Sequence, residues 1–239
     1  TFEIEITSGK LTGAQKVSRN GRAYAEFRGI PYAQQPLDDL RFEPPRPVKP
    51  WGTPGWDATR DGPFCLQYDL LTHVLLGDEA CLFLNVATPN LGISDKTATD
   101  PKSLFPVMVY FYGGAFMSGY SIVYSPAYFM DEDVVMVVIN YRVGLFGFLN
   151  TGDEVVRGNM GLKDQTMALR WVKENIAYFG GDPDRVTLMG QSAGGSSSHL
   201  HMLSPLSKGL FHRAISQSGN ALNYFAFTKD PRSQALRLG

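Results

Sequence analysis

Val186-Thr187-Leu188-Met189-Gly190-Gln191-Ser192-Ala193-Gly194 decides the fold of this chain, because an apolar run passes directly into a serine between two glycines. The run predicts a buried strand, and the residues that follow, through Leu203, fit a helix. This strand–turn–helix order is the context in which the serine of a G-x-S-x-G motif stands exposed on a strained turn, a nucleophile elbow. Gly190 and Gly194 are expected to shape the turn, since larger side chains would collide with the adjacent strand and helix. The pentapeptide alone also fits an ordinary turn, so the flanking strand carries the prediction.

Other apolar runs predict the rest of a sheet. Near-continuous apolar stretches, typical of parallel strands buried on both faces, occur at Leu82–Ala87, Pro106–Tyr112, Val134–Tyr141 and Val186–Gly190. Helical spacing predicts a helix over Leu162–Phe179, which Gly180-Gly181-Asp182-Pro183 ends, and a further strand is expected at Ala214–Gln217. Helices alternating with strands indicate an α/β fold with a mostly parallel central sheet flanked by helices.

The first third of the chain has a different pattern. Alternating segments that predict a small antiparallel N-terminal sheet lie at Glu3–Thr7, Leu11–Val17 and Arg22–Arg28. The proline-rich residues 31–63 leave no room for a long helix, and we expect an ordered loop anchored by Trp51 and Trp56. The polar stretch Leu91–Ser103 is expected to be an exposed loop.

Composition excludes several classes of protein. The 239 residues are 44% hydrophobic, enough for a sizeable core, and 22 basic residues against 23 acidic ones create no field for nucleic acid or anionic lipid. No apolar stretch approaches the ~20 residues of a membrane span. The N-terminus has no signal-peptide pattern, so a signal was either removed or never present.

Nothing in the sequence predicts a cofactor or a metal site. Two cysteines are too few for a cysteine zinc site, and Cys65 and Cys81 form either one loop-closing disulfide or two buried thiols of a cytosolic protein. No G-x-G-x-x-G or G-x-x-x-x-G-K motif is present to hold a nucleotide phosphate.

A second glycine-rich segment, Tyr112-Gly113-Gly114-Ala115-Phe116, follows a predicted strand. Backbone N–H groups on such a loop can hold the oxyanion that forms when a serine attacks an acyl carbonyl. We expect Gly114 and Ala115 to supply two donors and Ala193, the residue after the serine, to supply a third. The alternative, a glycine-rich turn over a phosphate, lacks its motif.

Together these residues resemble the type-B carboxylesterases and cholinesterases, and most of all insect carboxylesterases, including juvenile-hormone-esterase-like members. The segment from Phe179 to Ser196 is similar to that family's active-site signature throughout. Further family-like blocks follow in the family's order at Phe27–Ala33, Leu40–Phe42, Cys81–Val86, Asn140–Gly144 and Gly158–Leu162. The resemblance implies an α/β-hydrolase fold, of which residues 1–239 form the N-terminal portion of a single domain.

Carried over by position, the resemblance implies that Ser192 is the nucleophile of a serine carboxylic-ester hydrolase that works through an acyl-enzyme. It implies that Gly114, Ala115 and Ala193 are the oxyanion donors and that Gly113 shapes their loop. Ala115 stands where glycine is commoner in the family, a change that keeps the N–H. The expected partner is a small-molecule ester.

The two cysteines match the family's first disulfide. A disulfide between Cys65 and Cys81 implies a secretory-pathway history, with a cytoplasmic location as the alternative.

The expected borders of the acyl site are Tyr112, Phe116, Met117 and Gln191. The segment between the two cysteines has no tryptophan, whereas cholinesterases hold a quaternary ammonium with one on this loop. Gln191 replaces a glutamate of the cholinesterases and removes a negative charge beside the serine, although drift at a tolerant position explains it equally well. Neutral or apolar esters therefore fit better than choline esters.

The chain offers Ser192 no histidine in the expected order of serine, acid, histidine. Asp230 is the one acidic residue after the serine, and no histidine follows it. The four histidines, His73, His199, His201 and His212, are expected to be structural or at the surface. We therefore expect a C-terminal remainder of the same esterase to supply the glutamate and the histidine. Two alternatives share the fold, namely an inactive cholinesterase-like binding or adhesion protein and a lipase.

Overall fold

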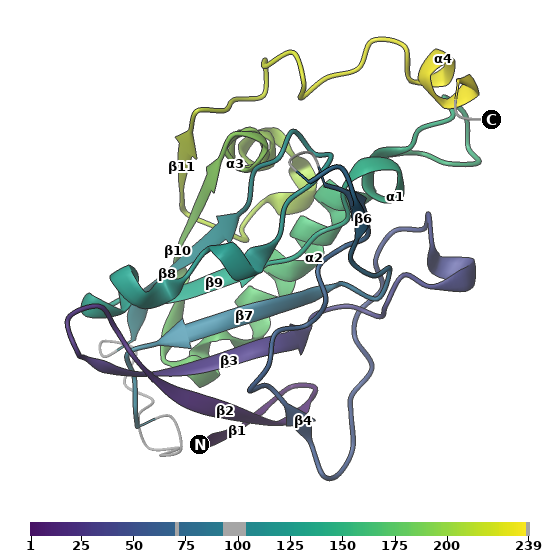
Figure 1. Ribbon diagram of the computed structural model, residues 1–239. Helices are drawn as coiled ribbons and strands as arrows, with labels where there is room; N and C mark the ends of the chain where they lie inside the picture. Colours follow the sequence, from purple (N-terminus) through teal and green to yellow (C-terminus); the bar gives the residue numbers. More distant parts are fainter. Residues whose placement is uncertain (70–71, 93–103, 238–239) are drawn as a thin grey trace.

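The computed structural model describes residues 1–69, 72–92 and 104–237, and a single large sheet organises them (Figure 1). Within these ranges the sheet has nine strands, ordered β1-β2-β3-β7-β9-β8-β10-β11, with β4 beside β2. The strands are β1 (Phe2–Ile6), β2 (Gly9–Val17), β3 (Ala23–Pro31), β4 (Trp56–Asp57), β7 (Phe83–Thr88), β8 (Phe105–Phe111), β9 (Val135–Ile139), β10 (Gly181–Gln191) and β11 (Arg213–Gln217). A separate hairpin joins β5 (Gln67–Tyr68) to β6 (Leu75–Leu76).

The parallel half of the sheet confirms the α/β prediction. Strands β9, β8, β10 and β11 run parallel to one another. The predicted parallel direction was wrong for the stretch Leu82–Ala87, because β7 is antiparallel to both β3 and β9. A continuous apolar run records burial on both faces, which a central antiparallel strand has as well, so it does not set strand direction.

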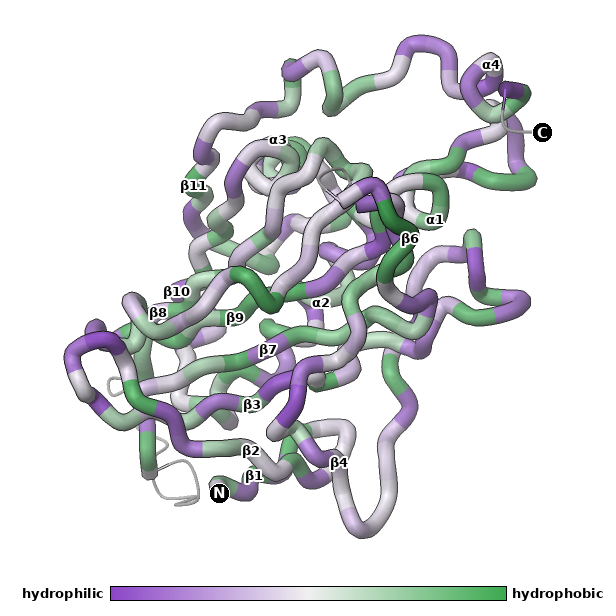
Figure 2. The backbone as a smooth tube through the Cα atoms, viewed as in Figure 1, coloured by the Kyte–Doolittle hydropathy of each residue, from purple (hydrophilic) through white to green (hydrophobic). Residues whose placement is uncertain are grey.

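The antiparallel N-terminal part is present as expected. Strands β1, β2 and β3 pair antiparallel, and β3 joins them to the central sheet through β7. The turn between β2 and β3, around Arg19 and Asn20, is hydrophilic and projects from the edge of the molecule (Figure 2).

Strand β9 shows why the centre of the sheet is buried on both faces. Val135, Val137 and Ile139 belong to the main core, whereas Met136 and Val138 point to a smaller cluster on the opposite face. The main core lies between the sheet and helix α2 (Met160–Asn175), which runs behind the strands in Figure 1. The smaller cluster is covered in front by the 3₁₀ segment Pro126–Asp131.

The helices differ slightly from the predicted bounds. Helix α2 begins two residues before the expected Leu162, and its last turn, Ile176–Phe179, tightens into a 3₁₀ helix. Gly180 then takes a left-handed conformation with φ 78°, which glycine adopts without strain. The other helices are α1 (Gly144–Phe148), α3 (Ala193–Leu203) and α4 (Pro231–Leu236). Short 3₁₀ segments lie at Asp38–Leu40, Ser121–Val123 and Pro205–Ser207.

The proline-rich loop is ordered and held by its tryptophans, as expected. The rings of Trp51 and Trp56 lie 5.7 Å apart. Their indole N–H groups donate to the carbonyls of Lys10 and Gly29 at 2.8 and 2.9 Å. Of the loop expected at Leu91–Ser103, residues 93–103 lie outside the described residues.

Candidate active site

The serine between β10 and α3 has a strained backbone. Ser192 has φ 54° and ψ −118°, a conformation that costs about 1–3 kcal/mol for a residue with a side chain. Its N–H donates to the carbonyl of Gln217 on β11 at 2.8 Å, and its own carbonyl accepts from the N–H of Ser196 at 2.9 Å. The predicted strand–turn–helix order is thus present, and the strained turn is fixed from both sides.

The two glycines of the motif have no room for a side chain. A Cβ on Gly190 would lie 2.3 Å from the carbonyl of Gly194, and a Cβ on Gly194 would lie 1.9 Å from the carbonyl oxygen of Phe111. Gly219, which follows β11, is as tightly placed, because its Cβ would lie 1.9 Å from the carbonyl oxygen of Ser192. The backbone of three strand ends therefore encloses the serine turn.

The second glycine-rich segment lies directly against the serine. A Cβ on Gly113 would be 3.0 Å from the Cβ of Ser192 and 2.6 Å from the carbonyl oxygen of Gln191. Beyond Gly113 the chain turns sharply, since Ala115 and Phe116 have φ values of 56° and 62°. The carbonyl of Gly114 closes this turn by accepting from the N–H groups of residues 117 and 118 at 2.9 and 3.0 Å.

Three backbone N–H groups beside the serine have no acceptor within the described part of the chain. They belong to Gly114, Ala115 and Ala193, the residues expected to donate to an oxyanion. N–H groups at the start of a helix carry partial positive charge, and Ala193 opens α3. Ala193 is buried, and Gly114 and Ala115 are partly buried. These donors are therefore able to bond an oxygen atom that does not belong to the described residues.

The four residues expected to border the acyl site are placed differently from one another. Phe116 is buried against the rings of Phe148 and Phe225, with centroids 4.9 and 6.4 Å away. Met117 is half exposed, and Gln191 faces solvent.

Tyr112, unlike Met117 and Gln191, has no exposed side chain. Its ring is fully buried and stacks on Tyr141 with centroids 4.3 Å apart. Each tyrosine hydroxyl donates to the other residue's carbonyl, at 2.6 and 2.8 Å. Burial raises the pKa of the Tyr112 hydroxyl, which stays protonated as a donor. Tyr112 therefore belongs to the framework under the loop, not to a substrate-facing wall.

The histidine rings bond or pack against residues other than Ser192. The Nδ1 atoms of His199 and His212 accept from the backbone N–H groups of Ala221 and Val186, both at 3.2 Å. His73 packs against Tyr68 on the disulfide segment. No hydrogen bond joins the Ser192 hydroxyl to a histidine or a carboxylate in the described ranges.

His201 is a structural histidine. It is buried, and its ring nitrogens lie 2.8 Å from Ser207 Oγ and from Gln165 Oε1. Burial lowers its pKa to about 4, so the ring is neutral at pH 7. Asp230, the only acid after the serine, caps α4 by accepting from the N–H of Ser233 at 3.0 Å.

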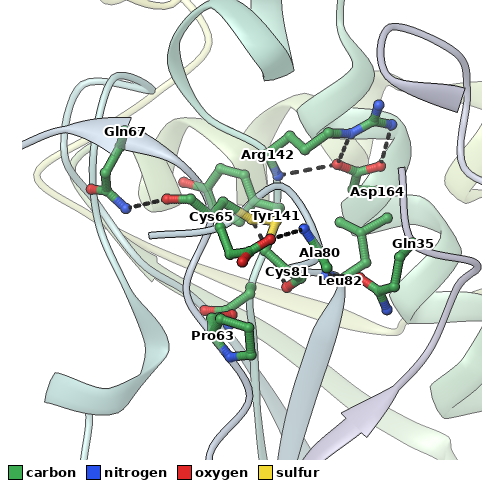
Figure 3. Close-up of a disulfide and its surroundings, with 12 residues drawn as sticks. Gln35, Pro63, Cys65, Gln67, Ala80, Cys81, Leu82, Tyr141, Arg142 and Asp164 are labelled. Atoms are coloured by element: carbon green, nitrogen blue, oxygen red, sulfur yellow. Dashed lines mark hydrogen bonds and ion pairs between the residues drawn. A yellow bond between two sulfur atoms is a disulfide. The ribbon is translucent and has the colours of Figure 1, made fainter. Parts of the chain in front are cut away.

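The disulfide between Cys65 and Cys81 is formed, which settles the alternative of two free thiols (Figure 3). It lies beside a buried ion pair between Arg142 and Asp164, which no sequence pattern predicted. The guanidinium Nε and Nη2 donate to the carboxylate at 2.8 and 2.7 Å, and both side chains are at most 3% exposed. Arg142 follows Tyr141 along the chain, so the pair ties α2 to the segment under the glycine loop.

The described residues offer neither a metal site nor a membrane-spanning helix. They include no group of three histidine, cysteine or acidic side chains able to hold a metal ion. In the same ranges, the helices are too short or too polar to cross a membrane.

Comparison with known proteins gives one family. The model of the carboxylesterase family matches residues 1–239. Venom carboxylesterase-6 of Apis mellifera is 46% identical over 99% of this chain and 42% of its own length. Juvenile hormone esterase of Tribolium castaneum is 49% identical over 91% of this chain and 36% of its own length.

A solved structure is similar throughout the chain. The juvenile hormone esterase of Manduca sexta, crystallised with OTFP covalently attached, has a TM-score of 0.85 and 35% identity over 99% of this chain. This chain covers 48% of that structure, and it therefore spans less than half the length of the relatives it matches here.

Proposed function

The chain belongs to the carboxylesterase family, and we propose that it carries the nucleophile and the oxyanion donors of a serine carboxylic-ester hydrolase. The observation that supports this most directly is the cluster of three acceptor-free N–H groups beside Ser192. A site that only needed a tight turn would have no reason to leave these donors unpaired.

The proposed reaction is acyl transfer in two steps. The Ser192 hydroxyl oxygen attacks the ester carbonyl carbon as its proton passes to a histidine, and the carbonyl electron pair moves onto the oxygen. The N–H groups of Gly114, Ala115 and Ala193 hold that oxyanion. Its collapse expels the alcohol, which takes the proton from the histidine and leaves an acyl-enzyme. Water then attacks by the same route and releases the acid.

The base and its acidic partner come from outside residues 1–239 in this proposal. The positions of all four histidines support this, since each ring packs or bonds elsewhere. His199 is two helical turns beyond the serine, about 10 Å along the axis at ~1.5 Å per residue.

The proposed substrates are neutral or apolar esters. The Cys65–Cys81 segment has no tryptophan to bind a quaternary ammonium, and the side chain next to the serine is the uncharged Gln191. Phe116 adds an apolar surface behind the donor loop. We also propose secretory-pathway maturation, which the formed disulfide supports.

Labelling and turnover of the whole protein test the proposal. A fluorophosphonate should label Ser192 stoichiometrically, and Ser192→Ala should abolish hydrolysis of p-nitrophenyl butyrate. Ser204→Ala, beyond the end of α3, is the matched control and should keep full activity. Turnover that survives Ser192→Ala would refute the assignment, and a folded wild type with neither label nor turnover would favour the binding-protein alternative.

A further inference from the structure

Gln67 makes three hydrogen bonds with its side-chain amide in a buried position. The residue is 3% exposed and lies on β5, two residues after Cys65. Its Oε1 accepts from the N–H of Gly119 at 2.6 Å, and its Nε2 donates to the carbonyl of Gly119 at 2.9 Å. Nε2 also donates to the carbonyl of Cys65 at 2.8 Å (Figure 3). The amide thus bonds Gly119 in both directions and binds it to the disulfide.

Gly119 in turn packs against the Gly113–Gly114 peptide, which contains the first proposed oxyanion donor. It has φ 132°, and a Cβ on it would lie 2.4 Å from the carbonyl oxygen of Gly113. The carbonyl of Gly113 and the N–H of Gly114 belong to one planar peptide unit. Contact of Gly119 with the Gly113 carbonyl therefore restrains the direction in which the Gly114 N–H points.

The peptide before Gly119 restrains the second donor. The carbonyl oxygen of Ser118 would lie 2.0 Å from a Cβ on Gly114, and the N–H of Ser118 donates to the carbonyl of Gly114. That carbonyl shares its peptide plane with the N–H of Ala115. The bonds between Gly119 and Gln67 fix the Ser118–Gly119 peptide, whose carbonyl lies against Gly114, and they restrain the adjoining Ser118 N–H through the Ser118 Cα. One side chain therefore restrains both donor planes.

We propose that Gln67 is a positioning residue of the oxyanion loop and that it transmits the restraint of the Cys65–Cys81 disulfide to the N–H groups of Gly114 and Ala115. This rests on the proposed function of that loop. The disulfide partner Cys81 stands just before β7, so the path runs from the sheet through the disulfide and Gln67 to the donors. Gln67 touches no reacting atom in this proposal and acts only through the backbone of Gly119.

The test compares Gln67 with Gln35, a glutamine that bonds the same region without reaching the loop. Gln35 Oε1 accepts from the N–H of Leu82, next to the disulfide, at 3.0 Å. The variants Gln67→Glu and Gln67→Met keep the length of the side chain. The first places a carboxylate oxygen against two carbonyls, and the second removes all three bonds. Gln35→Met is the control.

In the whole protein, kcat for p-nitrophenyl butyrate should fall about 10- to 100-fold in both Gln67 variants, less than the 10²–10³-fold typical for complete loss of one donor. KM should stay within about threefold, because ground-state binding does not use the donors. Affinity for a trifluoromethyl ketone, which forms a tetrahedral oxyanion on the serine, should fall by the same factor as kcat. Gln35→Met should change none of these quantities.

Each outcome decides a separate claim. Unchanged kcat and ketone affinity in folded Gln67 variants would overturn the positioning role, as would an equal loss in Gln35→Met. If one Gln67 variant fails to fold, the other carries the comparison, and if both fail, a Cys65→Ala/Cys81→Ala variant must show the same joint loss of kcat and ketone affinity or the proposal is wrong. Failure of the proposed function has a different sign: ester hydrolysis would persist in the Ser192→Ala variant. That result would overturn this inference as well.

Discussion

Gly194→Ala adds a single methyl group to the most crowded point of the serine turn. The new Cβ would lie 1.9 Å from the carbonyl oxygen of Phe111, whereas Cβ atoms in proteins essentially never come within 3.0 Å of another heavy atom. Either the start of α3 or the end of β8 must therefore move. Both movements reach the site, since α3 begins with the Ala193 N–H and β8 leads into Gly113.

The size of the effect follows from that overlap. Relief of the clash takes a shift of about 1 Å, and misplacement by that distance costs on the order of 10²-fold in rate. Overpacking of this kind also destabilises a protein by about 1–3 kcal/mol. We therefore expect kcat/KM to fall at least about 100-fold, while unfolding moves to lower urea concentration.

The assay pairs ester hydrolysis with urea unfolding in the whole protein. Gly52→Ala is the matched control, because a Cβ at this exposed glycine meets no atom within 4 Å, and it should leave both measurements near wild type. A Gly194→Ala protein with kcat/KM within threefold of wild type and an unchanged unfolding midpoint would refute the argument that the turn is closed to side chains.

Three other predictions concern stability. Asp164→Leu leaves the Arg142 guanidinium buried without its carboxylate and should lower the free energy of unfolding by about 3–5 kcal/mol, measured by urea titration. A Cys65→Ala/Cys81→Ala variant should lose about 3 kcal/mol of unfolding free energy, the chain-entropy value for a loop of this length. Reductant should lower the unfolding free energy of the wild type but leave that of the variant unchanged. Burial lowers the pKa of His201 to about 4, so the unfolded state binds a proton more readily than the folded state and the free energy of unfolding falls as the pH drops below 7. The wild type should lose about 2 kcal/mol of unfolding free energy between pH 7 and pH 5 through this residue, and His201→Gln should not show this loss. A pH dependence identical in wild type and His201→Gln would contradict the last of these.

Local sequence patterns predicted the elements around Ser192 because they depend on neighbours along the chain. The apolar run before Gly190 and the glycines after Ser192 are sufficient for the strand, the turn and the start of α3. The direction of β7 depends on which strands flank it in space, and its own six residues contain no record of that.

Contacts across long separations were equally invisible. The pairing of Arg142 with Asp164 links a loop to a helix, and the amide of Gln67 meets Gly119 more than fifty positions away. A buried glutamine with three bonds and an exposed one with none look the same in a single sequence. The prediction for Tyr112 was wrong about its side chain for a related reason, since its position at the end of β8 does not say that its ring is stacked beneath Tyr141.

The crowding around the serine turn limits how a protein of this kind can diversify. Positions 190, 194 and 219 are closed to any side chain by neighbouring backbone, and backbone atoms cannot adapt by changing rotamer. Met117 and Gln191 are the opposite case, because they stand at the rim and face solvent. Variation between related chains should therefore accumulate at Met117 and Gln191, while positions 190, 194 and 219 keep their glycines.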